Sequence, residues 1–173
     1  WFNPGESDFA RPTLDELAAA SEIVASEVLR SQSDTRRVDS QALRADTVFH
    51  LLPYTELPDR EAVEREVEET ADPRRRTWAR QVILPLLDRG ALPSACPQEI
   101  QVLQLDPDLR LVFLGGEILT EIGLHIKQAL EPATTVTVGY TNGLIGYVPG
   151  KETYPLGGYE VSSSYHLFLR PAP

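Results

Sequence analysis

The chain has 173 residues, of which 42% are hydrophobic and 24% are charged. This length allows one domain with a substantial core, and the composition is that of a globular protein. Lysine and arginine total 16 against 26 aspartate and glutamate residues, so the net charge is −10. An acidic surface repels phosphate backbones, which argues against nucleic acid as a partner. No apolar run approaches the roughly 20 residues that span a bilayer, so no transmembrane segment is predicted.

The N-terminal region predicts a loop followed by one long helix. Residues 1–12 contain proline and glycine and show little periodicity, which is typical of a loop. Thr13 and Glu16 then form a capping box for a helix that ends near Arg30. Helical spacing predicts that the helix buries one stripe of side chains. This stripe consists of Leu17, Ala20, Val24 and Val28.

A strand and a charged helix are predicted next. Residues 37–52 favour extended structure, and Pro53 and Pro58 bracket a turn. Asp59 can then cap a strongly charged helix that runs to about Thr70.

The following helix begins at Asp72-Pro73, because proline fits the first helical position, where no N–H is needed. Gly90 is expected to end it, and Pro85 predicts a kink or an early end. The basic run Arg74-Arg75-Arg76 comes after the acidic stretch 61–72. We interpret this run as one side of a solvated helix pair in preference to a phosphate site.

The second half of the chain predicts an α/β fold and is expected to hold the packed core. Residues 100–105 and 109–114 read as two strands of a hairpin around Asp106-Pro107-Asp108. A helix is expected from Glu117 to Leu130, and then a strand at residues 134–140. The order strand, strand, helix, strand predicts a mixed sheet with helices packed on it.

The strands at residues 109–114 and 134–140 are joined by one helix, so we expect them to be parallel and close together. Their following loops would then open at the same edge of the sheet. The second loop is rich in glycine and proline to Gly158, which predicts a long ordered loop over a site.

Few residues fit a generic catalytic motif. The single cysteine, Cys96, excludes an internal disulfide and a thiolate zinc site. The three histidines, His50, His125 and His166, lie far apart without paired metal spacing. His125 falls two turns after Glu117 on the predicted helix, so geometry allows a shared metal, although a lone helical histidine is more often structural.

Glu117 occupies the most distinctive position, where an apolar strand passes through two glycines into the predicted helix. In open sheets, ligands bind in the crevice beyond the carboxyl ends of the strands. A carboxylate there can be a helix-cap partner or an oxygen ligand to a divalent metal. Tyr147 and Tyr159 lie in the second loop, and each can equally be a packed aromatic residue. A metal-free hydrolase could pair Glu117 with Glu121, one helical turn later, but such pairs usually form a solvated face.

Three glycine-rich segments carry the most specific pattern in the chain. They are residues 114–117 (Leu-Gly-Gly-Glu), 139–149 (Gly-Tyr-Thr-Asn-Gly-Leu-Ile-Gly-Tyr-Val-Pro) and 157–160 (Gly-Gly-Tyr-Glu). Together they resemble the zinc-site region of the neutral/alkaline non-lysosomal ceramidase family, in their order and in the twelve-residue step from 147 to 159. The resemblance extends back through residues 74–90 and is closest to bacterial relatives of the ceramidases.

The resemblance implies a zinc-dependent hydrolase that cleaves a ceramide-like N-acyl amide bond through metal-activated water. It implies Glu117 and Tyr147 as zinc ligands, and Tyr159 as a catalytic donor to the scissile carbonyl oxygen. The two histidine ligands of the family lie N-terminal to the region that this chain resembles. Because many relatives are secreted, the resemblance also suggests an extracytoplasmic location.

The start of the chain adds a further expectation. The chain begins at Trp1 and contains no methionine. We therefore expect residues 1–173 to be a single domain, the C-terminal portion of a ceramidase-like catalytic domain that is inactive alone. Its partners would be the N-terminal part of the same protein and a small-molecule or lipid amide substrate. Asn3 stands where the family has a serine. The alternative is a catalytically degenerate binding or structural module of the same fold.

Overall fold

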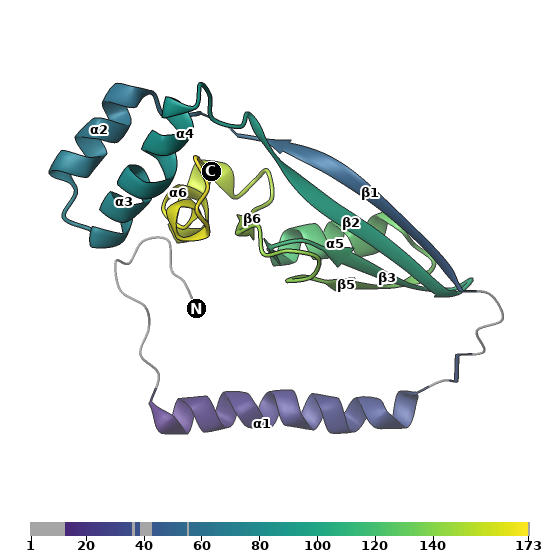
Figure 1. Cartoon of the computed structure of the whole chain (residues 1–173). Helices are drawn as coiled ribbons and strands as arrows, with labels where there is room; N and C mark the ends of the chain where they lie inside the picture. The colour runs from purple at the N-terminus through teal and green to yellow at the C-terminus, as the bar shows by residue number, and fades with distance from the viewer. Residues whose placement is uncertain (1–12, 36, 39–42, 55, 173) are drawn as a thin grey trace. The chain divides into compact units, whose positions relative to one another are not determined.

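The computed structural model describes residues 13–35, 37–38, 43–54 and 56–172, and Figure 1 shows its ribbon. The loop predicted at residues 1–12, including Asn3, lies outside these residues. The chain divides into two compact units, Trp1–Ser40 and Gln41–Pro173. With 44% helix and 24% strand, the fold is mixed α/β, which confirms the predicted class. Among the described residues, no helix has the length and apolar character needed to cross a membrane.

The first unit contains α1 (Leu14–Ser31), which ends in the 3-10 turn η1 (Gln32–Asp34). The predicted capping box is confirmed, since the Thr13 N–H donates to the Glu16 carboxylate at 2.8 Å and the Glu16 N–H donates to the Thr13 hydroxyl at 3.3 Å. Within this unit nothing buries the predicted apolar stripe, since α1 contains no buried residue. Helical spacing identifies an apolar face, but it does not identify what covers that face.

Two predicted caps start helices α2 (Arg60–Glu69) and α3 (Pro73–Trp78) of the second unit. Asp59 caps α2 through its side chain, as predicted. Arg75 of the basic run pairs with Glu66 of α2, with 2.7 Å between Nε and a carboxylate oxygen. The basic run therefore faces an acidic helix, which confirms the helix-pair interpretation.

The helix that begins with α3 changes its geometry half-way. A π-helical turn, η2 (Ala79–Ile83), follows α3 and leads into α4 (Leu84–Asp88). Pro85 lacks an N–H, and its ring crowds the carbonyl group four residues before it. The wider turn is the local distortion that Pro85 predicts. Gly90 follows the helix with φ 117°, as expected of a helix end.

The main buried cluster of the second unit lies among these helices. It consists of Val63, Trp78, Ala79 and Ile83. The Trp78 indole N–H donates to the carbonyl oxygen of Arg170 at 2.7 Å, which joins the cluster to the C-terminal segment. The prediction of a core in the second half is met only in part, because residues 100–105 are all half-buried. An apolar pattern predicts a strand, but it does not predict which layer covers it.

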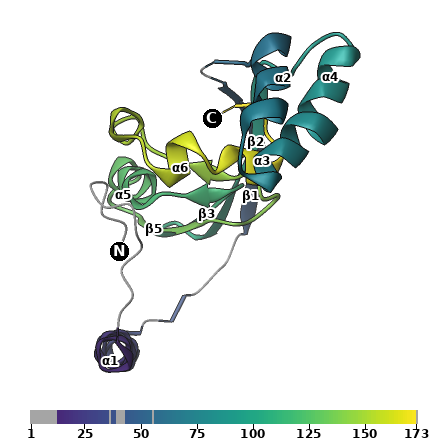
Figure 2. The ribbon, with the colours of Figure 1, turned by 90° about the vertical axis from the view of Figure 1, so that its left-hand side faces the viewer.

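The predicted mixed sheet has four strands in the order β1-β2-β3-β5. They are β1 (Arg44–Pro53), β2 (Ala95–Asp106), β3 (Leu109–Leu114) and β5 (Thr134–Val138). The pairs β1–β2 and β2–β3 are antiparallel, and the latter is the predicted hairpin. β3 and β5 are parallel neighbours, as predicted, and α5 (Thr120–Ala129) connects them and lies beside β5 (Figure 2).

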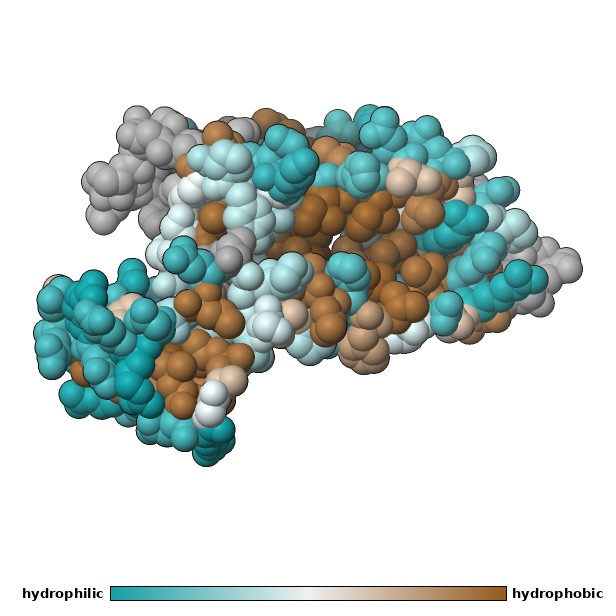
Figure 3. All heavy atoms as spheres, turned by 90° about the horizontal axis from the view of Figure 1, so that it is seen from above, coloured by the Kyte–Doolittle hydropathy of each residue, from teal (hydrophilic) through white to brown (hydrophobic). Residues whose placement is uncertain are grey.

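β1 is an edge of this sheet and pairs with β2 along its whole length, from Arg44 opposite Gln104 to Pro53 opposite Ala95. Its apolar side chains are largely exposed, with Phe49 at 69%. Figure 3 shows hydrophobic side chains gathered over part of the surface. Backbone pairing, more than burial, therefore holds β1 in place.

Candidate functional site

Glu117 lies on a short strand and not on the predicted helix. Glu117–Ile118 forms strand β4, Leu119 is the N-cap, and α5 begins only at Thr120. The interpretation of Glu117 as a helix-cap partner, or as a residue two turns before His125 on one helix, is therefore wrong. Gly116 has φ 86°, a conformation that suits glycine and separates β3 from the following segment.

β4 pairs with β6 (Tyr147–Val148) in a two-stranded parallel sheet. Glu117 and Tyr147 are register partners in this sheet, so their side chains share one face. The Glu117 N–H donates to the carbonyl oxygen of Gly146 at 2.8 Å. The structure thus brings together the two residues that the resemblance assigns to a metal.

Backbone hydrogen bonds fasten the loops after β3 and β5 to each other. The Gly116 N–H donates to the Gly143 carbonyl at 2.9 Å, and the Tyr140 N–H donates to the Gly116 carbonyl at 2.8 Å. A Cβ atom on Gly116 would lie 2.8 Å from the side chain of Ile145. This close approach leaves room only for glycine at position 116 and sets the starting point of β4.

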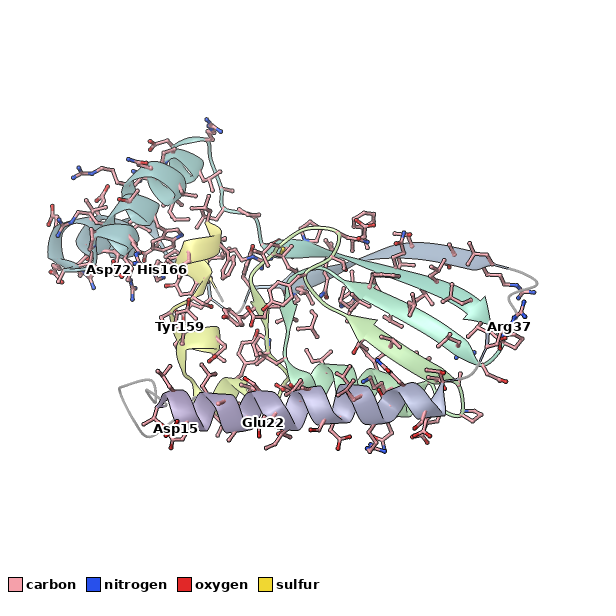
Figure 4. All side chains as sticks on the ribbon, turned by 90° about the horizontal axis from the view of Figure 1, so that it is seen from below. Asp15, Glu22, Arg37, Asp72, Tyr159 and His166 are labelled. Atoms are coloured by element: carbon pink, nitrogen blue, oxygen red, sulfur yellow. The ribbon has the colours of Figure 1, made fainter. Side chains whose placement is uncertain are left out.

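Tyr159 is the first residue of α6 (Tyr159–Ser162) and is labelled in Figure 4. Its ring packs edge-on against Tyr147, with 5.7 Å between the ring centroids. Phe168 packs against the same tyrosine at 6.0 Å. The three residues predicted for the site therefore lie together, since Tyr147 pairs with Glu117 in the sheet and packs against two aromatic rings, one of them Tyr159.

The Glu117 carboxylate helps to raise the pKa of two phenol groups. Burial and then hydrogen bonding to Glu117 raise the pKa of Tyr147 to about 12. Hydrogen bonding to Glu117 is the main cause that raises the pKa of Tyr140, ahead of burial. Both phenols are protonated at neutral pH, so each can donate a hydrogen bond to the carboxylate.

Tyr140 is the member of the cluster to which the sequence assigns no role. It has φ 58°, and 63% of its side chain is exposed. Non-glycine residues are uncommon in this left-handed conformation. The sequence could have indicated Tyr140 as a site residue. It follows β5 at the same sheet edge where Glu117 follows the parallel strand β3.

Glu121 fastens the outer part of the second loop. Its Oε1 atom accepts hydrogen bonds from the Gly150 N–H at 2.9 Å and from the Thr153 hydroxyl at 2.5 Å. The bond from Thr153 is the largest cause that lowers the pKa of Glu121. Because Glu117 lies on β4, the two carboxylates are not one turn apart on a helix, so the spacing behind the metal-free carboxylate pair is absent.

The histidines lie on separate elements. His50 is on β1, His125 is on α5, and His166 is in the 3-10 turn η4 (Tyr165–Phe168). His166 lies beside Asp72, with 3.9 Å between Nε2 and a carboxylate oxygen (Figure 4). Within the part of the chain that the structure describes, no three His, Cys, Asp or Glu side chains form a group that could hold a metal. The donors at the candidate site are therefore the oxygens of Glu117 and its neighbouring tyrosines.

In comparisons with known proteins, no family model matches the chain, and no curated protein or solved structure is significantly similar to it. A function for the chain therefore has to be argued from the arrangement of Glu117, Tyr147 and Tyr159.

Proposed function

We propose that Glu117, Tyr147 and Tyr159 form part of the active site of a zinc-dependent hydrolase that cleaves a ceramide-like N-acyl amide bond. The pairing of Glu117 with Tyr147 across β4 and β6 carries this proposal. It sets a carboxylate beside a phenol at the end of two parallel strands, where α/β sheets bind their ligands. The order and spacing of the three residues support the same assignment through the resemblance to ceramidases.

The donor set fits zinc in part. Carboxylate oxygen is a known zinc ligand, and a phenol becomes an anionic oxygen donor once its proton is lost. With a pKa of about 12, Tyr147 keeps that proton in the metal-free chain. A nearby dication reverses this preference, because it is the largest local charge in such a site. Catalytic zinc needs at least three protein ligands, so we propose that the histidines implied by the resemblance come from the N-terminal part of the same protein.

The residues of this chain would bind the zinc ion, orient the substrate amide and help to polarise its carbonyl group. Glu117 and Tyr147 would hold the ion, which supplies a polarised carbonyl and an activated water molecule when bound. Tyr159 would donate its phenolic hydrogen bond to the amide oxygen as that oxygen gains negative charge. Its edge-on packing against Tyr147, at 5.7 Å between centroids, links the donor to the ligand and fixes its orientation.

Zinc content and amide hydrolysis of the full-length protein test the proposal. Glu117→Gln and Tyr147→Phe each remove one ligand, whereas Tyr54→Phe removes a hydroxyl outside the cluster, from a ring that lies 5.8 Å from the Arg170 guanidinium. We expect the first two variants to lose zinc and activity and the control to keep both. Stoichiometric zinc in both ligand variants would overturn the proposal. A full-length protein that binds no zinc and cleaves no amide would instead support the degenerate binding module.

A further inference from the structure

Strand β1 has one side to which no strand of the described residues pairs. It lies at the edge of the four-stranded sheet, with β2 on its other side (Figure 1). Residues 47–53 contain no lysine, arginine, aspartate or glutamate. Val48, Phe49 and Leu51 are all more than half exposed. A long apolar edge strand without charges is a template for pairing with another strand.

The hydrogen bonds of β1 show which of its backbone groups point away from β2. In an antiparallel pair, alternate residues bond to the partner strand, and the residues between them turn their N–H and C=O groups outward. The Tyr54 N–H donates to the Ser94 carbonyl at 3.1 Å and continues the ladder, so the even-numbered residues of β1 bond to β2. The Thr47 N–H instead donates to the Asp46 carboxylate at 2.9 Å, which fits an outward residue. The outward residues with both an N–H and a C=O group are Ala45, Thr47, Phe49 and Leu51.

We propose that β1 pairs with β1 of a second copy of this chain, antiparallel and centred on Val48, so that the two sheets become one. A two-fold axis makes the two edge strands antiparallel and sets the same surface of each copy against the other. In this register Ala45 faces Leu51 of the second copy, and Thr47 faces Phe49. Each of these pairs joins two outward residues, which can exchange two backbone hydrogen bonds.

Other registers pair fewer of these backbone groups. A shift by one residue sets outward residues opposite residues that already bond to β2. A shift by two residues in one direction places Ala45 opposite Pro53, which has no N–H to donate. The same shift in the other direction places Leu51 opposite Leu43, which lies outside the strand. The backbone therefore favours the register centred on Val48.

The side chains fit the same register. Val48 faces its own copy at the centre, and Asp46 faces His50 of the second copy on the same side of the sheet. The Asp46 carboxylate can accept a hydrogen bond from the His50 imidazole, which frees the N–H of Thr47 for the second copy. Arg44 faces an uncharged residue, Leu52, so no like charges oppose each other. Charge and backbone thus favour the same occupant, a second copy of this chain.

Sedimentation velocity of the 173-residue chain over a concentration series tests the pairing. Val48→Lys brings two ammonium groups together at the centre of the interface, and like charges directly opposite destabilise a strand pair. Val136→Lys makes the same change on β5, at the other edge of the sheet. We expect a monomer–dimer equilibrium that Val48→Lys abolishes and Val136→Lys keeps. A chain that is monomeric at every concentration, a dimer that survives Val48→Lys, or one that Val136→Lys also abolishes would overturn the proposal.

Disulfide cross-linking tests the register without a change of charge. Cys96 is first replaced by alanine, since it is the single cysteine of the chain. Val48→Cys then sets two thiols opposite each other in a pair without backbone hydrogen bonds, where the Cβ atoms come close enough for a disulfide. Leu51→Cys is the control, because it would face Ala45 and lie far from its own copy. We expect a mild oxidant to give a covalent dimer in Val48→Cys and not in Leu51→Cys. No covalent dimer in Val48→Cys, or an equal yield in both variants, would overturn the proposal whatever the zinc content.

Discussion

A Cβ atom on Gly116 would lie 2.6 Å from the carbonyl oxygen of Gly146. This approach joins the loop after β3 to the loop after β5, one residue before Glu117 and one residue before Tyr147. Any larger residue at position 116 must push the two loops apart, and with them the two side chains that form the centre of the candidate site.

Gly116→Ala tests how tightly these loops are joined. Gly116 has φ 86° and meets backbone at 2.6 Å, whereas Gly90 has φ 117° and nothing within 4 Å. We expect Gly90→Ala to cost about 1 kcal/mol from backbone strain alone, and Gly116→Ala to cost about 3 kcal/mol because the clash adds to the strain. Urea unfolding measures both values. Similar losses in the two variants would mean that the loop contact is loose.

The ionisation of Tyr147 reports its contact with Glu117 in the metal-free chain. Burial and the carboxylate together raise its pKa to about 12, so Glu117→Gln should lower the pKa part of the way towards about 10. A raised tyrosine pKa stabilises the fold below about pH 10, and this contribution is lost as the pH rises towards 12. Ultraviolet titration against Tyr147→Phe isolates the transition. Glu152→Gln removes the same charge at an exposed position and should leave it unchanged.

Under the proposed function, Tyr159→Phe should affect the rate of hydrolysis more than substrate binding. The change removes one hydroxyl and keeps the ring that packs on Tyr147. Loss of one such donor typically lowers kcat by about 100-fold. The measurement is kcat and KM of the zinc-loaded full-length protein, with zinc content as the control. An unchanged kcat would leave Tyr159 a packing role only.

Glu121 should make stability depend on acid pH. Its pKa is lowered mainly by the Thr153 hydrogen bond, so its contribution is present above the ordinary glutamate pKa of about 4.3. The contribution is lost as the pH falls through the lowered value. We expect the free energy of unfolding to fall less steeply below about pH 5 in Glu121→Gln and in Thr153→Val. Identical pH profiles in wild type and both variants would exclude this role.

His166 should destabilise the fold as the pH falls below neutrality. It is only 7% exposed, and burial, followed by the charge of Arg75, lowers its pKa. The folded state therefore favours the neutral imidazole, and stability is complete above about pH 6.5 and falls as the pH drops through the lowered pKa. His166→Gln should remove this dependence in urea unfolding between about pH 7 and 5. A variant with the full wild-type pH dependence would contradict the assignment.

The elements that the sequence predicts well are those with local signals. Thr13 and Asp59 mark helix starts because capping involves residues only three apart. The parallel pairing of β3 with β5 follows from the single helix between them. In each case the interacting residues are close in sequence, or a single helix joins the two strands that pair.

The position of Glu117 could not be predicted in the same way. Ile118, Ile122 and Ile126 recur at helical spacing and extend the predicted helix over residues that form β4. The competing interaction is a pairing with residues 147–148, far along the chain, and such a pairing overrides local preference. Tyr140 was missed for a related reason, since its place beside the Glu117 segment depends on a backbone hydrogen bond between two loops and not on its own segment.

The π-helical turn η2 changes which side of the helix the residues after it occupy. Trp78 and Ile83 face the same buried cluster although they are five residues apart. In an uninterrupted α-helix each residue rotates by about 100°, so five residues would leave these two side chains about 140° out of phase. The additional residue in the wider turn brings both onto one side. A single deletion within residues 79–82 would leave these two side chains four residues apart, about 40° out of phase in a regular α-helix, so the helix could straighten and still keep the following residues on the core side.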